Sequence, residues 1–253
     1  MTTFGVLLRK ELREQWRTYR LGIICAIALV FGLMSPLLAK YLPELLKNAA
    51  GPIQFTAPTP TVGDAVDQTI KNLGTSVGTF GAILLAMGLV AREKERGTAA
   101  FVLAKPASRL GFLASKFIGL VATLGAAITI GGLAAYVYAM LLFEALPIAG
   151  FLACLSLLLL AALVYGAVTF FASTLVKSAL PAAGMGIGSL ILFSLIGVVP
   201  QLKSWTPNAL LGPARALALG QAPGDLWLPV GANLALIGLL LGAAWLAFRR
   251  QEL

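Results

Sequence analysis

The segment from residue 91 to residue 109 holds the longest unbroken run of charged side chains in the chain. Five charged residues follow one another at positions 92–96, and Gly97 comes directly after them. A short apolar run then ends at Pro106. Acids and bases that alternate in this way keep a helix end in water, where they either contact a partner protein or merely enforce the topology of the spans. The chemistry that this segment predicts is recognition at a surface, not the making or breaking of covalent bonds.

Glycine, proline and helix-capping residues are expected to divide this segment into short helices and turns. A helix is expected to continue into water until Gly97 lets the backbone turn, and Thr98 can cap the next turn. A short helix is expected over residues 99–104, before Pro106 ends it and Ser108 caps the helix that follows. The apolar side chains that this short helix exposes are Phe101, Val102 and Leu103. Such residues fit either a groove on a partner protein or the lipid interface, and residue types alone leave both open.

Side chains that usually catalyse reactions are scarce. Histidine is absent, which removes the commonest general base and metal ligand. The two cysteines, Cys25 and Cys154, lie inside long apolar runs and are interpreted as small hydrophobic residues. The glycine-rich loop G-x-x-x-x-G-K-S/T, which binds the phosphates of ATP, does not occur. We therefore expect no catalytic site, no metal site and no bound cofactor in this chain.

The composition is that of a protein embedded in a membrane. Of the 253 residues, 59% are hydrophobic and 11% are charged, and the mean hydropathy is +0.91. In a soluble domain about a quarter of all residues are charged, so this composition excludes a soluble enzyme. The net charge of +9 fits nucleic acid or anionic lipid. Because the basic residues lie next to the apolar runs, we expect contact with membrane lipid and none with nucleic acid.

Six apolar segments are long enough to cross a bilayer as helices. A hydrocarbon core of about 30 Å requires about 20 residues at about 1.5 Å of rise per residue. The predicted spans are residues 21–42, 73–91, 117–143, 147–176, 179–199 and 226–248. Only Lys40 brings a charge into any of them. We therefore predict an all-α integral membrane protein in which residues 1–253 form a single transmembrane domain.

The basic residues indicate the orientation of the six spans. An even number of spans puts both termini on one side, and that side then holds 14 of the 19 basic residues. The other side holds Lys40, Lys47, Lys71, Lys203 and Arg215. Because cytoplasmic loops carry an excess of Lys and Arg, we expect both termini in the cytoplasm.

Residues 1–20 are predicted to form an amphipathic helix at the membrane interface. Phe4, Leu8, Leu12 and Trp16 recur every fourth residue and lie on one helix face, with charged residues around the remainder. Acidic residues among the basic ones argue against a cleavable signal peptide. This helix either anchors the first span or contacts a partner protein, and the sequence leaves both open.

Two proline-rich loops are expected on the side away from the termini. In the first, residues 43–72, Thr61 stands three residues before Asp64, close to the capping box that begins a helix. In the second, residues 200–225, four prolines punctuate the chain around residues 209–219, an apolar stretch too short to cross. This stretch either re-enters the membrane, where it would line a path, or lies at the interface.

The charged segment resembles the membrane subunit of ATP-binding-cassette exporters of the type-2 permease family. Members share a run of acids and bases followed by Gly-Thr, a short helix, and a proline with a small residue and an arginine behind it. Residues 93–98, Glu-Lys-Glu-Arg-Gly-Thr, and residues 105–109, Lys-Pro-Ala-Ser-Arg, match this pattern. The resemblance covers the whole chain, including Lys-Glu-Leu-Arg at residues 10–13, six spans, a broken external segment and a short basic C-terminus.

The resemblance implies a half-transporter that forms an export pathway with a second copy or a closely related permease. Two separate ATP-binding-cassette subunits would hold ATP and Mg²⁺ and would bind the cytoplasmic loop, residues 92–116, through its short coupling helix. It also implies the cytoplasmic membrane of a prokaryote. The residues that it assigns to ATPase coupling are Glu93, Glu95, Arg96, Gly97, Thr98, Phe101, Val102, Leu103, Pro106 and Arg109.

Other classes of membrane protein fit the sequence less well. An ion-coupled secondary transporter needs ionisable groups near the midplane of its spans, and these spans have none there. Unwound backbone at residues 131–132 or 184–188 could bind sodium instead, although such glycines more often serve close helix packing. An intramembrane enzyme would have only hydroxyl groups as catalytic side chains. A channel would need a charged or carbonyl-lined filter, and the sequence contains no repeated pattern of that kind. A membrane anchor without transport activity stays open.

Overall fold

The computed structural model describes residues 3–49, 59–98 and 108–251, and every regular element in these ranges is a helix. Six helical segments are long and apolar enough to cross a membrane, which confirms the all-α fold with six spans. They are α2 (Arg20–Ala49), a composite second span, α7 (Arg109–Leu142), α8 (Ile148–Leu175), α9 (Ala179–Ile196) and α11 (Trp227–Arg249). Each of the six predicted spans corresponds to one of them.

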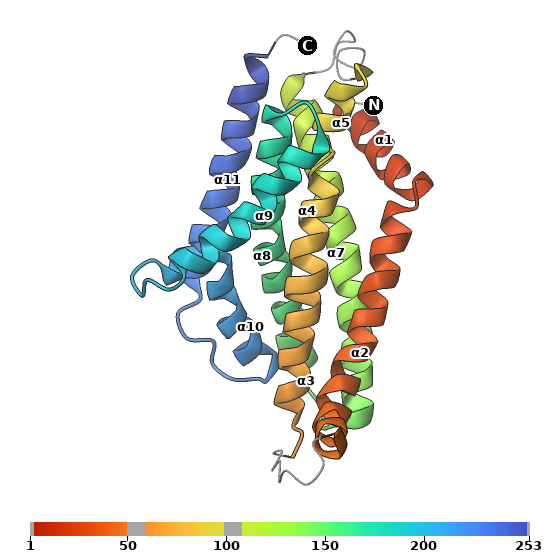
Figure 1. Ribbon diagram of the computed structural model, residues 1–253, viewed down its shortest axis with the longest axis vertical. Helices are drawn as coiled ribbons and strands as arrows, with labels where there is room; N and C mark the ends of the chain where they lie inside the picture. The colour runs from red at the N-terminus through yellow and green to blue at the C-terminus, as the bar shows by residue number, and fades with distance from the viewer. Residues whose placement is uncertain (1–2, 50–58, 99–107, 252–253) are drawn as a thin grey trace.

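The central helix of the bundle is α8. It contacts α7, α9, α11, the composite second span and the short helix α10 (Leu211–Ala218). Its side chains Phe151, Leu158 and Phe170 are almost completely buried. Both ends of the chain lie at the same end of the molecule (Figure 1), as an even number of crossings requires.

The second span is assembled from three consecutive helices. The first, α3 (Val62–Thr69), begins at the predicted capping box, in which the Asp64 carboxylate accepts a hydrogen bond from the Thr61 amide at 2.8 Å. The π-helix η1 (Ile70–Phe80) follows, and α4 (Gly81–Ala86) completes the span. A π-helix of 11 residues is unusual, and π-helical turns concentrate at functional positions.

The second span does not continue unbroken into water as expected from the sequence. Residues 87–90 form a turn after α4, and α5 (Ala91–Glu95) is a separate short helix. The Ser173 hydroxyl of α8 accepts hydrogen bonds from the amides of Val90 and Ala91, at 3.2 and 2.9 Å. Because these amides have a side-chain acceptor, the helix can stop there without leaving them unsatisfied.

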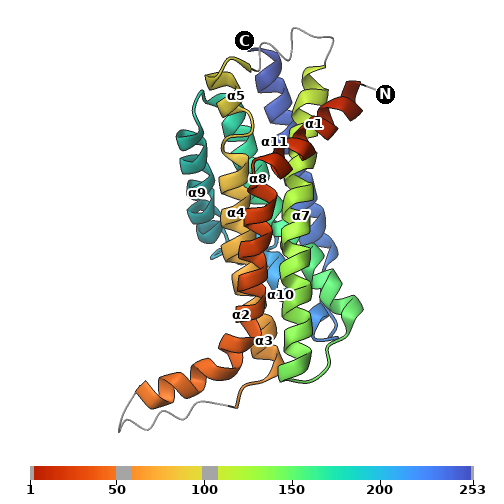
Figure 2. The ribbon, with the colours of Figure 1, turned by 90° about the vertical axis from the view of Figure 1, so that its right-hand side faces the viewer.

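The first transmembrane helix, α2, is longer than the predicted span. It continues through Pro43 to Ala49, beyond the expected end at Leu42. Its last part turns away from the other helices (Figure 2). A proline inside a helix removes one backbone hydrogen bond and bends the axis, and α2 contains both Pro36 and Pro43.

The two glycine clusters considered as helix breaks lie inside continuous helices. In α7, a Cβ atom on Gly131 would collide with the Ala28 carbonyl of α2, and one on Gly132 with Leu155 of α8. These glycines therefore serve close packing. In α9, a Cβ atom on Gly184 or Gly188 would meet no described atom within 4 Å. That face of α9 is open.

The segment between α9 and α11 is broken into short pieces. Two 3₁₀ turns, η2 (Lys203–Trp205) and η3 (Pro207–Leu210), lead into α10. α10 lies against α8 in the half of the bundle away from the termini (Figure 1), and its Ala214 and Ala218 are fully buried. Arg215 of α10 pairs with Asp67 of α3 at 2.6 Å. The re-entrant course of this segment through a membrane stays a prediction.

Candidate functional site

The described first part of the charged segment, which holds α5, lies at the end of the bundle where both termini are found (Figure 1). Gly97 has a φ of +69°, a left-handed conformation that glycine adopts easily, so the predicted turn is confirmed. The Thr98 hydroxyl donates to the Glu93 carbonyl at 3.2 Å across this turn. On the far side of the loop, Ser108 caps α7 as predicted, because its hydroxyl accepts from the Gly111 amide at 3.0 Å.

The predicted coupling residues fall into groups with different surroundings. Phe101, Val102, Leu103 and Pro106 lie outside the described residues, so their docking role stays a prediction. Glu95 and Arg96 are exposed, and neither has an ion-pair partner in the described part of the chain. These two side chains are therefore accessible to a partner protein.

Glu93 faces the interior of the protein instead. Its Oε1 atom lies 2.7 Å from Nζ of Lys116 in α7, and the same Nζ lies 3.1 Å from Oε1 of Glu11. The side chains of Lys116, Glu11 and Glu93 are 3%, 7% and 15% exposed. We refer to these three residues as the Lys116 cluster. Lys10 approaches both carboxylates from the surface, at 3.8 and 3.5 Å. A lysine buried to this extent requires such partners.

Glu11 comes from α1 (Thr3–Arg17), the predicted amphipathic helix. Glu11 and Gln15 are buried one turn apart, on the side where α1 packs against α7. A Cβ atom on Gly119 of α7 would lie 2.9 Å from the Gln15 amide nitrogen, so the Gln15 side chain packs closely over this glycine. The exposed residues of the predicted apolar face are Phe4, Leu12 and Trp16. α1 thus buries Glu11 and Gln15 against the protein and exposes apolar side chains beside basic ones, as a helix at a lipid interface does.

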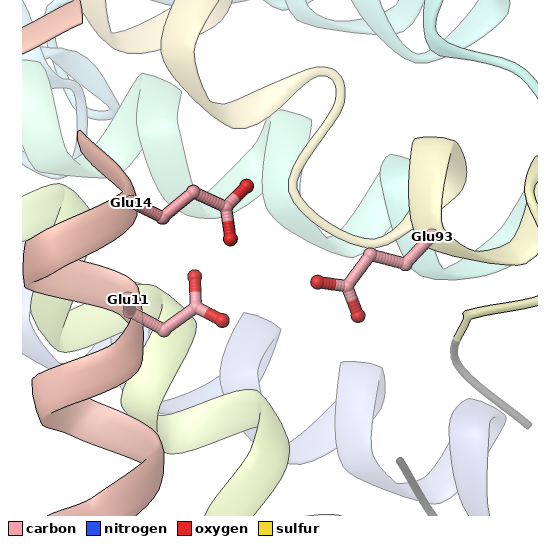
Figure 3. A group of neighbouring side chains, drawn as sticks. All are labelled: Glu11, Glu14 and Glu93. Carbon is pink, nitrogen blue, oxygen red and sulfur yellow. The ribbon is translucent and has the colours of Figure 1, made fainter. Parts of the chain in front are cut away.

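Three carboxylates converge at this place. Glu11, Glu14 and Glu93 each have an oxygen atom within 4.8 Å of the others, and Figure 3 shows the three side chains pointing into one space. Oxygen atoms at this spacing suit a hard divalent cation. However, the ammonium group of Lys116 contacts both Glu11 and Glu93 and supplies the positive charge. We therefore interpret Glu11 and Glu93 as ion-paired and do not interpret the three carboxylates as a metal site.

A cavity of about 200 Å³ lies beside the Lys116 cluster. Arg20, Arg92 and Arg96 line it together with the three glutamates and both lysines. Two buried oxygen atoms of lining residues, Oε1 of Gln15 and Oε2 of Glu93, have no hydrogen-bond partner among the residues described. Polar atoms of this kind are usually satisfied by water. The cavity therefore provides space and solvent for charged side chains to rearrange.

Arg109, the last residue of the charged motif, holds the C-terminal end of α11. Its Nη1 atom donates to the carbonyl oxygens of Phe248, Arg249 and Gln251, at 3.0, 2.7 and 3.0 Å. The last carbonyls of a helix lack partners within the helix and carry a partial negative charge. Arg109 therefore satisfies and stabilises this helix end.

Lys94 attaches the same segment to α8. Its Nζ atom donates to the Thr174 carbonyl and to Oε1 of Gln251, both at 2.9 Å. The Gln251 side-chain amide donates to the same Thr174 carbonyl at 2.9 Å. Glu93, Lys94 and Arg109 thus attach the two ends of the loop to α7, α8 and α11.

Comparison with known proteins identifies the family. The sequence model described as "ABC-2 family transporter protein" matches residues 6–253. This chain belongs to the ABC-2 transporter family. It is similar to the "Uncharacterized transmembrane protein YxlG" of Bacillus subtilis (strain 168), with 27% identity over 261 residues that cover 100% of this chain and 99% of the relative. The resemblance noted in the charged motif is confirmed. ABC-2 proteins are membrane transport subunits and generally work with ATP-binding-cassette subunits.

In this ABC-2 protein, the second span also carries an open polar face. Lys71, Thr75 and Ser76 of η1 are exposed on the outside of the chain. Figure 1 shows this composite helix between α9 and α2, and η1 packs against α2. An ammonium group has no partner in hydrocarbon, whereas Ser and Thr hydroxyls can bond to their own helix, so Lys71 favours contact with protein or water over lipid tails.

Proposed function

We propose that this chain is the permease subunit of an ATP-driven transporter and that its loop between the second and third spans docks onto an ATP-binding-cassette subunit. The family and the six spans support a membrane transport subunit. The observation that carries the proposal is the attachment of both ends of the loop to several spans at once. A loop that only enforced topology would not need these attachments.

The attachments give the loop a mechanical role. Glu93 connects it to α7, Lys94 to α8 and Arg109 to α11. Hydrogen bonds from charged side chains are costly to break, so a displacement of the loop is passed to α8 through Lys94 and to α11 through Arg109. Packed helices respond by small rigid-body shifts. ATP bound with Mg²⁺ on the partner subunit can therefore drive the spans of a chain that has no nucleotide loop.

The proposal includes two copies of this chain, or one copy with a closely related permease, around a central path. The exposed polar residues of η1 would face that path, because the ammonium group of Lys71 would have no partner in hydrocarbon. Each copy would bind one ATPase subunit. Export is the direction that the family resemblance supports. The excess of basic residues supports a cytoplasmic location for both termini, and the expected membrane is the cytoplasmic membrane of a prokaryote.

The first experiment is to purify the tagged chain from its native membrane in mild detergent and to count the proteins that accompany it. We expect an ATP-binding-cassette ATPase at two copies for every two copies of this chain. A chain that purifies alone in every detergent that preserves its fold would contradict the proposal and favour an ion-coupled carrier or an anchor.

A substitution in the loop tests the docking residues directly. Phe101→Asp puts a charge into the apolar run of the loop, so we expect normal membrane insertion but loss of the ATPase or of its stimulation. Phe101→Leu, which keeps an apolar side chain at the same position, is the matched control and should keep the ATPase. Equal ATPase recovery and stimulation with Phe101→Asp and with the unchanged chain would refute the assignment of Phe101.

A further inference from the structure

Lys116 is buried with two acidic partners that belong to different elements. Glu11 on α1 lies 3.1 Å from its ammonium group, and Glu93 on α5 lies 2.7 Å from it. A lysine that is 3% exposed and loses its only partner becomes an uncompensated buried charge. With two partners, one can leave while the other stays.

Glu93 is the partner that is free to leave. α5 is only five residues long, with the turn of residues 87–90 before it and Gly97 after it. The second carboxylate oxygen of Glu93 has no hydrogen-bond partner among the described residues. Arg92 and Arg96 line the cavity beside it and offer two positive charges to a departing carboxylate. Glu93 can therefore move without entering an apolar environment.

Glu11 is the partner that stays. Its side chain is 7% exposed, and α1 packs against α7 around it. Gln15, one turn further along α1, fits against Gly119 of α7 and fixes the same contact. Lys10 is 44% exposed and approaches both carboxylates, so it can follow either of them in solvent.

We infer that Lys116 is a positioning residue that holds α1 through Glu11 while Glu93 leaves and returns as the loop moves. This inference rests on the proposed function, because the motion of the loop comes from the ATPase. Each displacement of α5 then breaks one ion pair without stranding the buried ammonium group. α1 and α7 remain a fixed pair against which α5 moves.

Three variants of the purified transporter complex in nanodiscs test this inference through their ATPase rates. In Glu11→Gln, Lys116 depends on Glu93 alone, so the departure of Glu93 would strand it, and we expect hydrolysis to slow about tenfold. The double variant E11Q/K116M has no ammonium group to strand and should hydrolyse ATP at least about threefold faster than E11Q. Glu14 lines the same cavity, but its carboxylate has no ion-pair partner in the described ranges. The ATPase rate of Glu14→Gln should therefore stay within about twofold of that of the unchanged complex.

The rescue by a second substitution distinguishes positioning from simple stabilisation. If the ion pairs only stabilise the fold, E11Q/K116M loses more contacts than E11Q and should be slower. A double variant that gains less than threefold over E11Q would overturn the inference.

Melting of the chain without an ATPase separates this inference from the proposed function. Glu11→Gln and Glu93→Gln each leave Lys116 one carboxylate partner. The variant E11Q/E93Q removes both carboxylate partners. We expect E11Q/E93Q to lower the melting temperature by more than the sum of the decreases that the two single variants cause. Additive losses would overturn the two-partner arrangement. If no ATPase accompanies the unchanged chain, the proposed function fails, and the melting comparison still decides whether Lys116 needs either carboxylate.

Discussion

The two ends of the bundle hold their charges in opposite ways. At the end with the termini, Lys116 and its carboxylate partners are removed from solvent almost completely. At the other end, Arg215 and Asp67 form a shorter contact, 2.6 Å, but their side chains stay 45% and 38% exposed. An exposed pair contributes little to stability, whereas removing one member of a buried pair is strongly destabilising.

This difference separates a structural connection from a surface contact. The buried cluster joins α1, α5 and α7, three elements around the loop that we propose for ATPase docking. Its ion pairs are largely shielded from bulk solvent, so breaking one is costly unless another charged group takes its place, and this end changes between few arrangements. The external pair joins α3 and α10, and water can replace it at low cost. The external end can therefore adjust its shape while the terminal end transmits displacement.

The largest effect is expected from removing the buried cation. Lys116→Met leaves Glu11 and Glu93 buried without their main partner, and we expect a loss of about 3–5 kcal/mol in the free energy of unfolding. Denaturation of the purified chain in mixed micelles, followed by circular dichroism, measures this loss. Lys116→Arg keeps the charge and is the control, and it should lose less stability than Lys116→Met despite the larger side chain.

A triple variant checks that the loss comes from unpaired charge and not from lost packing. E11Q/E93Q/K116M has neither buried carboxylates nor the buried ammonium group, so it should recover part of the stability that K116M loses. A triple variant less stable than K116M would show that side-chain packing, and not charge, dominates at this end.

A smaller effect is expected from Arg109. Arg109→Ala leaves the last carbonyls of α11 without their charged donor, which costs about 1.5–3 kcal/mol in the free energy of unfolding. Trypsin should also cleave after Arg249 and Arg250 faster, because the helix end frays. Arg96→Ala is the matched control, since Arg96 is exposed and has no ion pair in the described ranges. Equal cleavage in the two variants would mean that α11 ends stably without Arg109.

Local features of the sequence predict most of the fold. The six spans follow from the length of apolar segments, and residues close in sequence fix the helix ends. Thr61 and Asp64 form their capping box, Gly97 turns the backbone, and Ser108 caps α7. The π-helix η1 was not predicted, because apolar spacing does not distinguish it from an α-helix. The break after α4 was also missed, because it depends on a hydroxyl from α8.

The Lys116 cluster could not be predicted, because its members are far apart in sequence. Lys116 is 105 positions from Glu11 and 23 from Glu93. In the sequence, Glu11 belongs to the polar face of an interfacial helix, and Lys116 counts toward the cytoplasmic excess of basic residues. One signal was available, since Lys116 immediately precedes the third predicted span, and a charge at that depth needs a partner. Which carboxylate supplies it depends on how α1 and α5 pack against α7.

The smallest effect is expected at the external end. Arg215→Ala should cost about 0.2–1 kcal/mol in the free energy of unfolding, and Asp67→Asn about as much, because both side chains are partly in solvent. The loss should shrink further in about 0.5 M salt, which screens exposed charges. Denaturation of both variants at low and high salt measures this. A loss above about 2 kcal/mol that salt does not reduce would mean that this pair is covered in the membrane. A second copy of the chain or a lipid headgroup would then have to lie over α3 and α10, and the contrast between the two ends would hold only for the isolated subunit.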